Sequence, residues 1–287
     1  MTADVAAVTA FRPRQHRITV DKGMAVSGII VLAAVVLAVF GREISPQNPL
    51  TQNLLAAAQP PSAAHLLGTD QLGRDVLART LVGARTAVLG PLVIAAVTVV
   101  LSTLLGLIAG YTGGWVDSVA GRAADVVYAV PPLVVAILVV GVLGGGLTLG
   151  VIVLSFLNVP AGFRTIRAAT LEQKSLPYVE SAWVLGRSRW RIMAVHILPN
   201  IRPVAVATFF LAFTYGFVDL ATLSFLGLGV APGTPDWGNM VSASQVLVFE
   251  NPWSALAPLL LIVVTAVSAN VLGESLEGAL LAKVTRR

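Results

Sequence analysis

The longest stretch of this chain without a charged residue runs from Val126 to Phe163, 38 residues in all. A membrane-spanning helix needs about 20 mostly apolar residues, so this stretch is too long for a single crossing. Gly144–Gly146 interrupts it near its middle, and glycine permits the sharp backbone turn of a hairpin. The sequence therefore predicts two membrane helices joined by a tight turn.

The composition of the whole chain agrees with a membrane protein. Charged residues make up 11% of the 287 residues and hydrophobic residues 56%, whereas soluble domains carry about 25% charged residues. With so few charges, much of the surface must face lipid. The same numbers exclude a disordered chain, which needs low hydrophobicity. We therefore expect an all-α membrane protein.

Further charge-poor stretches place the other helices. We expect six transmembrane helices within residues 24–278, between tails at 1–23 and 279–287. The sequence after Phe40 lacks the small-residue cleavage site of a signal peptide, so the first helix is predicted to be permanent. The predicted helices lie at about 24–41, 87–111, 119–143, 147–165, 203–226 and 254–275.

The distribution of Lys and Arg predicts the orientation. With the N-terminus in the cytoplasm, fifteen of the nineteen basic residues fall on the cytoplasmic side, seven of them within residues 164–202. Cytoplasmic loops carry an excess of Lys and Arg, so we expect both termini to be cytoplasmic. The opposite side holds Arg42, Arg74, Arg79 and Arg85.

Residues 42–85 are too long for a simple external connector. Their first part is rich in proline, and Thr69 or Asp70 is then predicted to cap a short amphipathic helix on the outer ends of the spans. This helix is either a structural lid or a docking surface for an external partner. Its apolar stripe would consist of Leu72, Val76, Leu77 and Leu81.

A second external loop is predicted at residues 228–253. It contains Trp237 and Trp253, and tryptophans beside span ends usually anchor a protein at the membrane interface. We expect both to do so here.

A charge at mid-bilayer costs roughly 2.5–3.5 kcal/mol, so charged residues inside the predicted helices need an explanation. Arg122 and Asp125 lie three apart and are expected to pair on one helix face. Asp219 in the fifth span is either bonded to a neighbouring helix or a candidate residue of a translocation path.

The cytoplasmic segment 164–202 is predicted to form two short helices. Proline is tolerated in the first turn, so Ser175-Leu176-Pro177 starts one helix, and Gly186 ends it in the left-handed conformation. Ser188 is expected to cap the second helix. Leu198-Pro199 lacks an amide and is expected to bend the chain into the fifth span.

Residues of this segment match the EAA motif. Glu180-Ser181-Ala182, Gly186 and Leu198-Pro199 have its spacing, with Ser181 and His196 as departures from its usual residues. On this motif the chain resembles the permease subunits of bacterial ABC importers. Three further stretches between residues 68 and 240 are similar to the DppC/OppC branch, and the resemblance covers residues 24 to about 278. These stretches are Gly68–Asp75, Gly113–Asp117 with Asp125 and Pro131-Pro132, and Ser224–Val230 with Pro235 and Trp237–Met240.

The resemblance implies a type I ABC importer permease fold in the bacterial cell membrane. It also implies the partners: a second, similar permease, two ABC ATPase subunits or one fused ATPase, and an external binding protein that delivers di- or oligopeptides. The EAA loop, residues 164–202, would couple the ATPases to the membrane helices. Small residues would let the loop pack closely in a cleft of an ATPase, and charged residues would form polar contacts around the rim of that cleft. The alternative interpretation is a basic loop that only sets the membrane topology. The coupling residues are Glu180, Ser181, Ala182, Gly186, Arg187, Leu198 and Pro199, with Arg189 and Arg191 on the rim.

Other functions find little support in the sequence. The chain has no cysteine, no ligand-spaced histidine pair and no phosphate-binding loop, so we expect no catalytic residue, metal or cofactor here and place ATP and Mg²⁺ on partner ATPases. No basic and aromatic face indicates nucleic acid. Within the same family, glutathione or a nickel chelate is the alternative cargo. An ion-coupled secondary transporter or an intramembrane enzyme would need ionisable residues at mid-membrane that are not evident.

Overall fold

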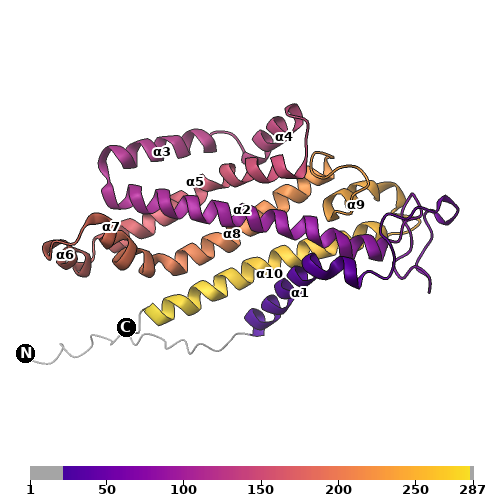
Figure 1. Cartoon of the computed structure of the whole chain (residues 1–287), viewed down its shortest axis with the longest axis horizontal. Coiled ribbons are helices and arrows are strands. Elements are labelled where there is room, and N and C mark those ends of the chain that lie inside the picture. The colour runs from indigo at the N-terminus through magenta and orange to yellow at the C-terminus, as the bar shows by residue number, and fades with distance from the viewer. Residues whose placement is uncertain (1–21, 285–287) are drawn as a thin grey trace, which may run out of the picture.

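The computed structural model describes residues 22–284, and these form helices joined by loops, with no strand (Figure 1). The predicted all-α class is confirmed. The helices are α1 (Lys22–Ile44), α2 (Val76–Thr112), α3 (Gly114–Tyr128), α4 (Pro132–Val142), α5 (Leu147–Lys174), α6 (Pro177–Val184), α7 (Arg189–Arg191), α8 (Leu198–Phe225), α9 (Trp237–Ala243) and α10 (Trp253–Val284), with the short turns η1 (Leu54–Ala56), η2 (Ile192–Ile197) and η3 (Gln245–Leu247).

Within the described residues, five helices are long and apolar enough to cross a membrane, and a sixth crossing arises if α3 and α4 count as one span. The span predicted at 119–143 consists of two helices, since α3 and α4 are bent by 72° relative to each other. Pro131 and Pro132 explain the break, because proline lacks the amide and excludes the preceding residue from helical geometry.

The predicted hairpin between the third and fourth spans is present. Gly144, Gly145 and Gly146 have φ angles of +97°, +77° and +109°, a region that other residues rarely adopt. The Gly146 amide donates to the carbonyl of Leu228, so the hairpin is tied to the loop that follows α8.

The prediction of a separate amphipathic helix before the second span is wrong. α2 runs for 37 residues from Val76 without a break, so Val76, Leu77 and Leu81 belong to the same helix as the span, and Leu72 precedes it. The cap is Asp75, which accepts from the amide of Ala78 at 2.7 Å, and not Thr69 or Asp70. At 1.5 Å per residue α2 is about 55 Å long, and it therefore projects beyond a hydrocarbon core of about 30 Å.

α2, α5 and α8 lie at the centre of the elongated bundle, with α1 and α10 along one side and α3 and α4 along the other (Figure 1). The start of α1 and the end of α10 lie towards the same end as α6 and α7. The opposite end, called the outer end below, carries the loops at residues 45–75 and 226–252.

Glycines let α2 and α5 approach closely. A Cβ added at Gly162 of α5 would lie 2.5 Å from Ser102 Oγ, and one at Gly106 of α2 would lie 2.9 Å from the Arg167 amide nitrogen. Ser102 Oγ also donates to the carbonyl of Val159. Small residues thus allow α2 and α5 to pack closely at this crossing.

Replacing Gly162 with leucine is expected to destabilise the bundle by about 1–3 kcal/mol or more, because the added side chain has no space against α2. The matched control is Gly121→Leu, since a Cβ at Gly121 meets nothing within 4 Å. Thermal unfolding of the two purified variants measures the difference. Equal melting temperatures would show that the crossing tolerates a side chain.

The loops of the outer end are folded against the helices. The Trp237 side chain is buried, with 1% of its surface exposed, and its Nε1 donates to the carbonyl of Thr80 at 2.8 Å. The prediction of an interfacial anchor is therefore wrong for Trp237, because the loop folds back over the start of α2. Trp253 is 43% exposed at the start of α10, as an interfacial residue would be.

A buried ion network holds the same end together. Asp70 Oδ2 accepts from Arg74 Nε at 2.7 Å and lies 3.4 Å from Arg79 Nε. Arg79 Nη1 donates to the carbonyls of Pro49 and Gly233, which lie in two different loops. One carboxylate thus contacts two buried guanidinium groups, and Arg79 connects α2 to both loops.

Candidate coupling site

The EAA loop forms the end of the bundle opposite the outer end. α6 begins at Pro177, where the missing amide costs nothing in the first turn. It ends in a Schellman motif: Gly186 has φ +71° and donates to the carbonyl of Trp183, while the Arg187 amide donates to that of Ala182. The predicted start and stop of this helix are confirmed.

The connection from α6 to α8 differs from the prediction. Ser188 Oγ accepts from the Arg191 amide, so the predicted cap is present. The chain then continues as one helix through η2, a π-helical segment, into α8, so the predicted second short helix is not a separate element. The wider π turn, in which the Leu198 amide donates to the carbonyl of Met193, explains how a helix can continue into a proline.

One face of α6 packs against the bundle. Val179 and Ala182 are 4% and 5% exposed, and both belong to a buried cluster formed by the ends of three long helices and η2. Ala182 was predicted to seat in a partner's cleft; instead its side chain lies inside this chain's own core. The other members of the cluster are Leu107, Tyr111, Ile166, Ile192, Met193, Ile197 and Ile201.

Hydrogen bonds fix α6 to the start of α8. The Tyr178 hydroxyl donates to Gln173 Oε1 at 2.7 Å and accepts from Asn200 Nδ2 at 3.0 Å. Asn200 Nδ2 also donates to the carbonyl of His196. Burial raises the pKa of the Tyr178 hydroxyl above its ordinary value, so it stays protonated as this donor. α6 is therefore attached to α5 and α8 by both apolar and polar contacts.

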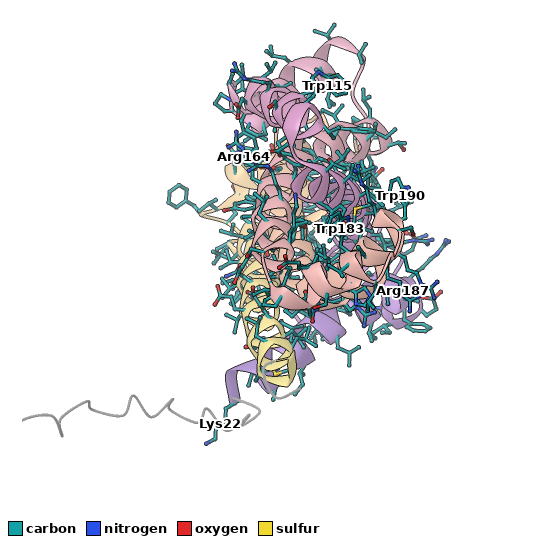
Figure 2. All side chains as sticks on the ribbon, turned by 90° about the vertical axis from the view of Figure 1, so that its left-hand side faces the viewer. Lys22, Trp115, Arg164, Trp183, Arg187 and Trp190 are labelled. Carbon is teal, nitrogen blue, oxygen red and sulfur yellow. The ribbon has the colours of Figure 1, made fainter. Side chains whose placement is uncertain are left out.

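The other face of α6 is apolar and exposed. Trp183, Val184 and Leu185 are 66%, 72% and 79% exposed, and Trp190 of α7 is 67% exposed. Figure 2 views the molecule from this end, with Trp183 and Trp190 towards the viewer and Arg187 beside them. We call Trp183, Val184, Leu185 and Trp190 the apolar tip; the sequence analysis missed it, although Trp183-Val184-Leu185 directly precedes the turn glycine.

The remaining predicted coupling residues surround this tip. Gly186, Arg187, Arg189 and Arg191 are exposed, as expected for a rim. Glu180 lines a pocket of about 310 Å³ together with Arg189 and other residues.

Not every predicted coupling residue points outwards. Ser181 is exposed, but its hydroxyl donates to the carbonyl of Pro177 within its own helix. Leu198 and Pro199 are half-buried at the start of α8. These two residues therefore connect the site to the membrane and do not form its outer surface.

A second polar feature lies on the side of the bundle. Arg164 Nη2 donates to Asp125 Oδ1 at 2.7 Å and stacks over the Tyr128 ring. The predicted pair of Asp125 with Arg122 is wrong, because a guanidinium on the neighbouring helix reaches Asp125. The side chains of Arg164 and Asp125 are 50% and 64% exposed. Arg164 lies about 26 Å along α5 from Leu147, which is within the thickness of a hydrocarbon core of about 30 Å.

Asp219 lies in α8, about 30 Å along the helix from Leu198, and is half-buried. It is therefore remote from the EAA loop. A pocket of about 250 Å³ between α2, α5, α8 and α10 does not include it. The polar residues of that pocket, which the sequence analysis did not single out, include Thr98, Asn158, Thr165 and Tyr215.

Residues 102–284, including the whole EAA loop, match the model of the family described as binding-protein-dependent transport system inner membrane component. The chain belongs to this family. It is a multi-pass permease of the bacterial inner membrane, and the resemblance based on the EAA motif is confirmed.

Curated relatives place this permease in the peptide branch of the ABC importers. It is 35% identical over 257 residues to the glutathione transport system permease protein GsiD of Pectobacterium atrosepticum, covering 88% of the chain and 85% of that protein. It is 32% identical to the dipeptide transport system permease protein DppC of Haemophilus influenzae, over 91% of the chain and 90% of that protein. It is 34% identical to the di/tripeptide transport system permease protein DppC of Pseudomonas aeruginosa, over 91% of the chain and 88% of that protein.

Proposed function

We propose that this permease passes di- or oligopeptides from an external substrate-binding protein into the cytoplasm, driven by ATP hydrolysis on separate subunits. The observation that carries the proposal is the near full-length match to permeases named for dipeptides, di/tripeptides and glutathione. Glutathione is itself a small peptide and is the second candidate cargo, since relatives named for it share 35–36% of their residues with this chain. A nickel chelate is the remaining alternative.

The apolar tip is the proposed contact with the ATPase. Four large apolar side chains exposed to the cytoplasm would be costly unless a partner covered them, and clustered apolar patches of this kind mark interaction surfaces. We assign the polar rim of this contact to Glu180, Gly186, Arg187, Arg189 and Arg191. ATP and Mg²⁺ would be held by the ATPases, two subunits or one fused chain.

The proposed movement follows from how α6 is attached. Its buried face packs on α2, α5 and α8, and Asn200 connects it to the start of α8. A displacement of the tip by a closing ATPase would therefore be transmitted to three membrane helices together. In this mechanism Ala182, Leu198 and Pro199 belong to the lever itself, and Ser181 is a local helix contact.

We place the second permease or a water-filled path against the side that carries Arg164 and Asp125. An exposed ion pair near this edge of the hydrocarbon core is covered more favourably by protein or water than by lipid. Asp219 remains a candidate path residue. The cytoplasmic location of both termini rests on the positive-inside distribution, and this side assignment is part of the proposal.

Reconstitution with the partner subunits in proteoliposomes tests the proposal. Labelled dipeptide, or glutathione, should enter only with the binding protein outside and ATP on the side of the EAA loop. Uptake driven by an ion gradient without ATP would contradict it. A preference for glutathione over dipeptides would retain the transport mechanism and change the cargo.

A further inference from the structure

The outer end of the bundle has four arginines, and the fold uses only two of them. Arg74 and Arg79 lie beside Asp70 in the buried network. Arg42 and Arg85 are exposed, and neither forms an ion pair with a carboxylate among residues 22–284. Two guanidinium groups at the same end of the molecule therefore have no ion-paired carboxylate within the described part of the chain.

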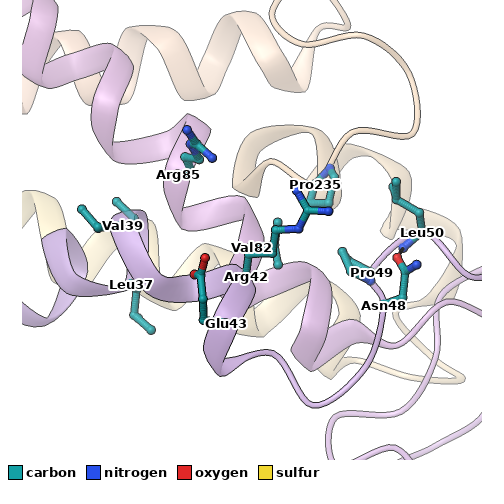
Figure 3. Close-up of a pocket in the computed structure, with 11 residues that line it drawn as sticks. Leu37, Val39, Arg42, Glu43, Asn48, Pro49, Leu50, Val82, Arg85 and Pro235 are labelled. Atoms are coloured by element: carbon teal, nitrogen blue, oxygen red, sulfur yellow. Dashed lines mark hydrogen bonds between the residues drawn. The ribbon is translucent and has the colours of Figure 1, made fainter.

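Both unpaired arginines line one pocket. It has a volume of about 230 Å³ and lies between α1, α2 and the loops of the outer end. Figure 3 shows Arg42 extending from α1 and Arg85 from α2. A water occupies about 30 Å³ in the liquid, so the pocket is large enough for a phosphate group. Its other polar residues are Glu43 and Asn48.

A close helix contact fixes the depth of the two charges. Gly41 of α1 packs directly on the backbone of α2, since a Cβ there would lie 2.3 Å from the carbonyl oxygen of Leu81. Arg85 follows Leu81 by one helical turn, about 5.4 Å towards the centre of the bundle. Arg42, in the last turn of α1, lies at the level of the contact. The two charges therefore differ in position along the bundle by about one helical turn.

The rest of the pocket wall is apolar. Leu37, Val39 and Val82 line it, and Figure 3 shows Leu37 and Val39 on the side away from the outer loops. The pocket thus has a cationic part, formed by Arg42 and Arg85, and an apolar part on the side away from the outer loops. A soluble anion would contact favourably only the cationic part. An amphiphile, with an anionic headgroup and an apolar chain, would contact both parts favourably.

We infer that Arg42 and Arg85 bind the phosphate of an anionic phospholipid, whose acyl chain lies along Leu37 and Val39. Arginine suits this role because its planar group donates two parallel hydrogen bonds to a phosphate. Glu43 lowers the net positive charge of the site.

Native mass spectrometry of the assembled complex from phosphatidylglycerol nanodiscs tests the inference. The wild-type complex should retain a bound phosphatidylglycerol, and Arg42→Gln/Arg85→Gln should retain about tenfold less. Arg122→Gln is the matched control, an exposed arginine outside the pocket, and should retain as much as wild type. Glu43→Gln should retain more. Equal retention in the double variant and wild type would overturn the inference.

A second arm separates lipid from soluble phosphate. In phosphatidylcholine nanodiscs, inorganic phosphate should not raise the melting temperature of the wild-type complex, whereas exchange into phosphatidylglycerol should raise it. Stabilisation by inorganic phosphate that disappears in the double variant would identify a soluble anion as the occupant and overturn the lipid assignment. The melting temperature also reports whether the variants are folded.

Discussion

Leu185→Asp is expected to detach the ATPase partner and to reduce ATP-driven uptake by roughly thirtyfold or more, while the permease itself still folds. Leu185 is 79% exposed at the end of α6, so the substitution removes no core contact. In the assembled importer the same position is proposed to be covered, where an unpaired carboxylate is unfavourable. Loss of a central apolar contact costs about 2 kcal/mol or more, which corresponds to that factor.

The matched control for this variant is Phe249→Asp. Phe249 is fully exposed at the outer end, so the same type of change is made far from the EAA loop. Co-purification of the ATPase, quantified per permease, should fall for Leu185→Asp and stay unchanged for Phe249→Asp. If Leu185→Asp retained the ATPase and full uptake, the apolar tip would not be the contact.

The second large effect is expected for Asp70→Asn, which should destabilise the protein by about 3–5 kcal/mol, the usual cost of breaking a buried ion pair. The variant leaves the guanidinium groups of Arg74 and Arg79 buried without a counter-charge; their side chains are 5% and 3% exposed. It also weakens the turn before α2, because Asp70 Oδ1 accepts from the amides of Leu72 and Arg74.

Thermal unfolding of the purified complex measures this effect. Glu250→Gln serves as the control, since Glu250 is an exposed carboxylate at the same end with no ion pair among the described residues. Its melting temperature should match wild type. A melting temperature of Asp70→Asn as high as that of the control would show that the two arginines do not depend on Asp70.

Features set by local chemistry could be predicted from the sequence. Charge-free stretches located the long helices, and residues with special backbone geometry placed their limits. Gly144–Gly146 makes the hairpin, Pro177 starts α6, Gly186 ends it and Ser188 caps α7. In each of these cases the residue itself restricts or permits a backbone conformation, and no distant contact is needed.

Features set by contacts between distant parts of the chain could not be predicted from the sequence. Trp237 is buried because a loop folds over α2, and Asp125 pairs with Arg164 because α3 lies against α5. Ala182 faces inwards for a similar reason, since the ends of three helices meet beneath α6. Spacing in the sequence shows which side chains lie close together on one helix. It does not show which side chain of a neighbouring helix will form the stronger contact.

The central claim is that the apolar tip contacts a cytoplasmic ATPase, and a cysteine introduced at Leu185 tests it most directly. The natural chain has no cysteine, so Leu185→Cys and Phe249→Cys each provide one unique cross-linking position. In membranes containing the assembled importer, a thiol-directed cross-linker should join Leu185→Cys to an ATPase subunit and should not join Phe249→Cys to one. A cross-link from Phe249→Cys to the ATPase, with none from Leu185→Cys, would contradict both the coupling site and the proposed orientation.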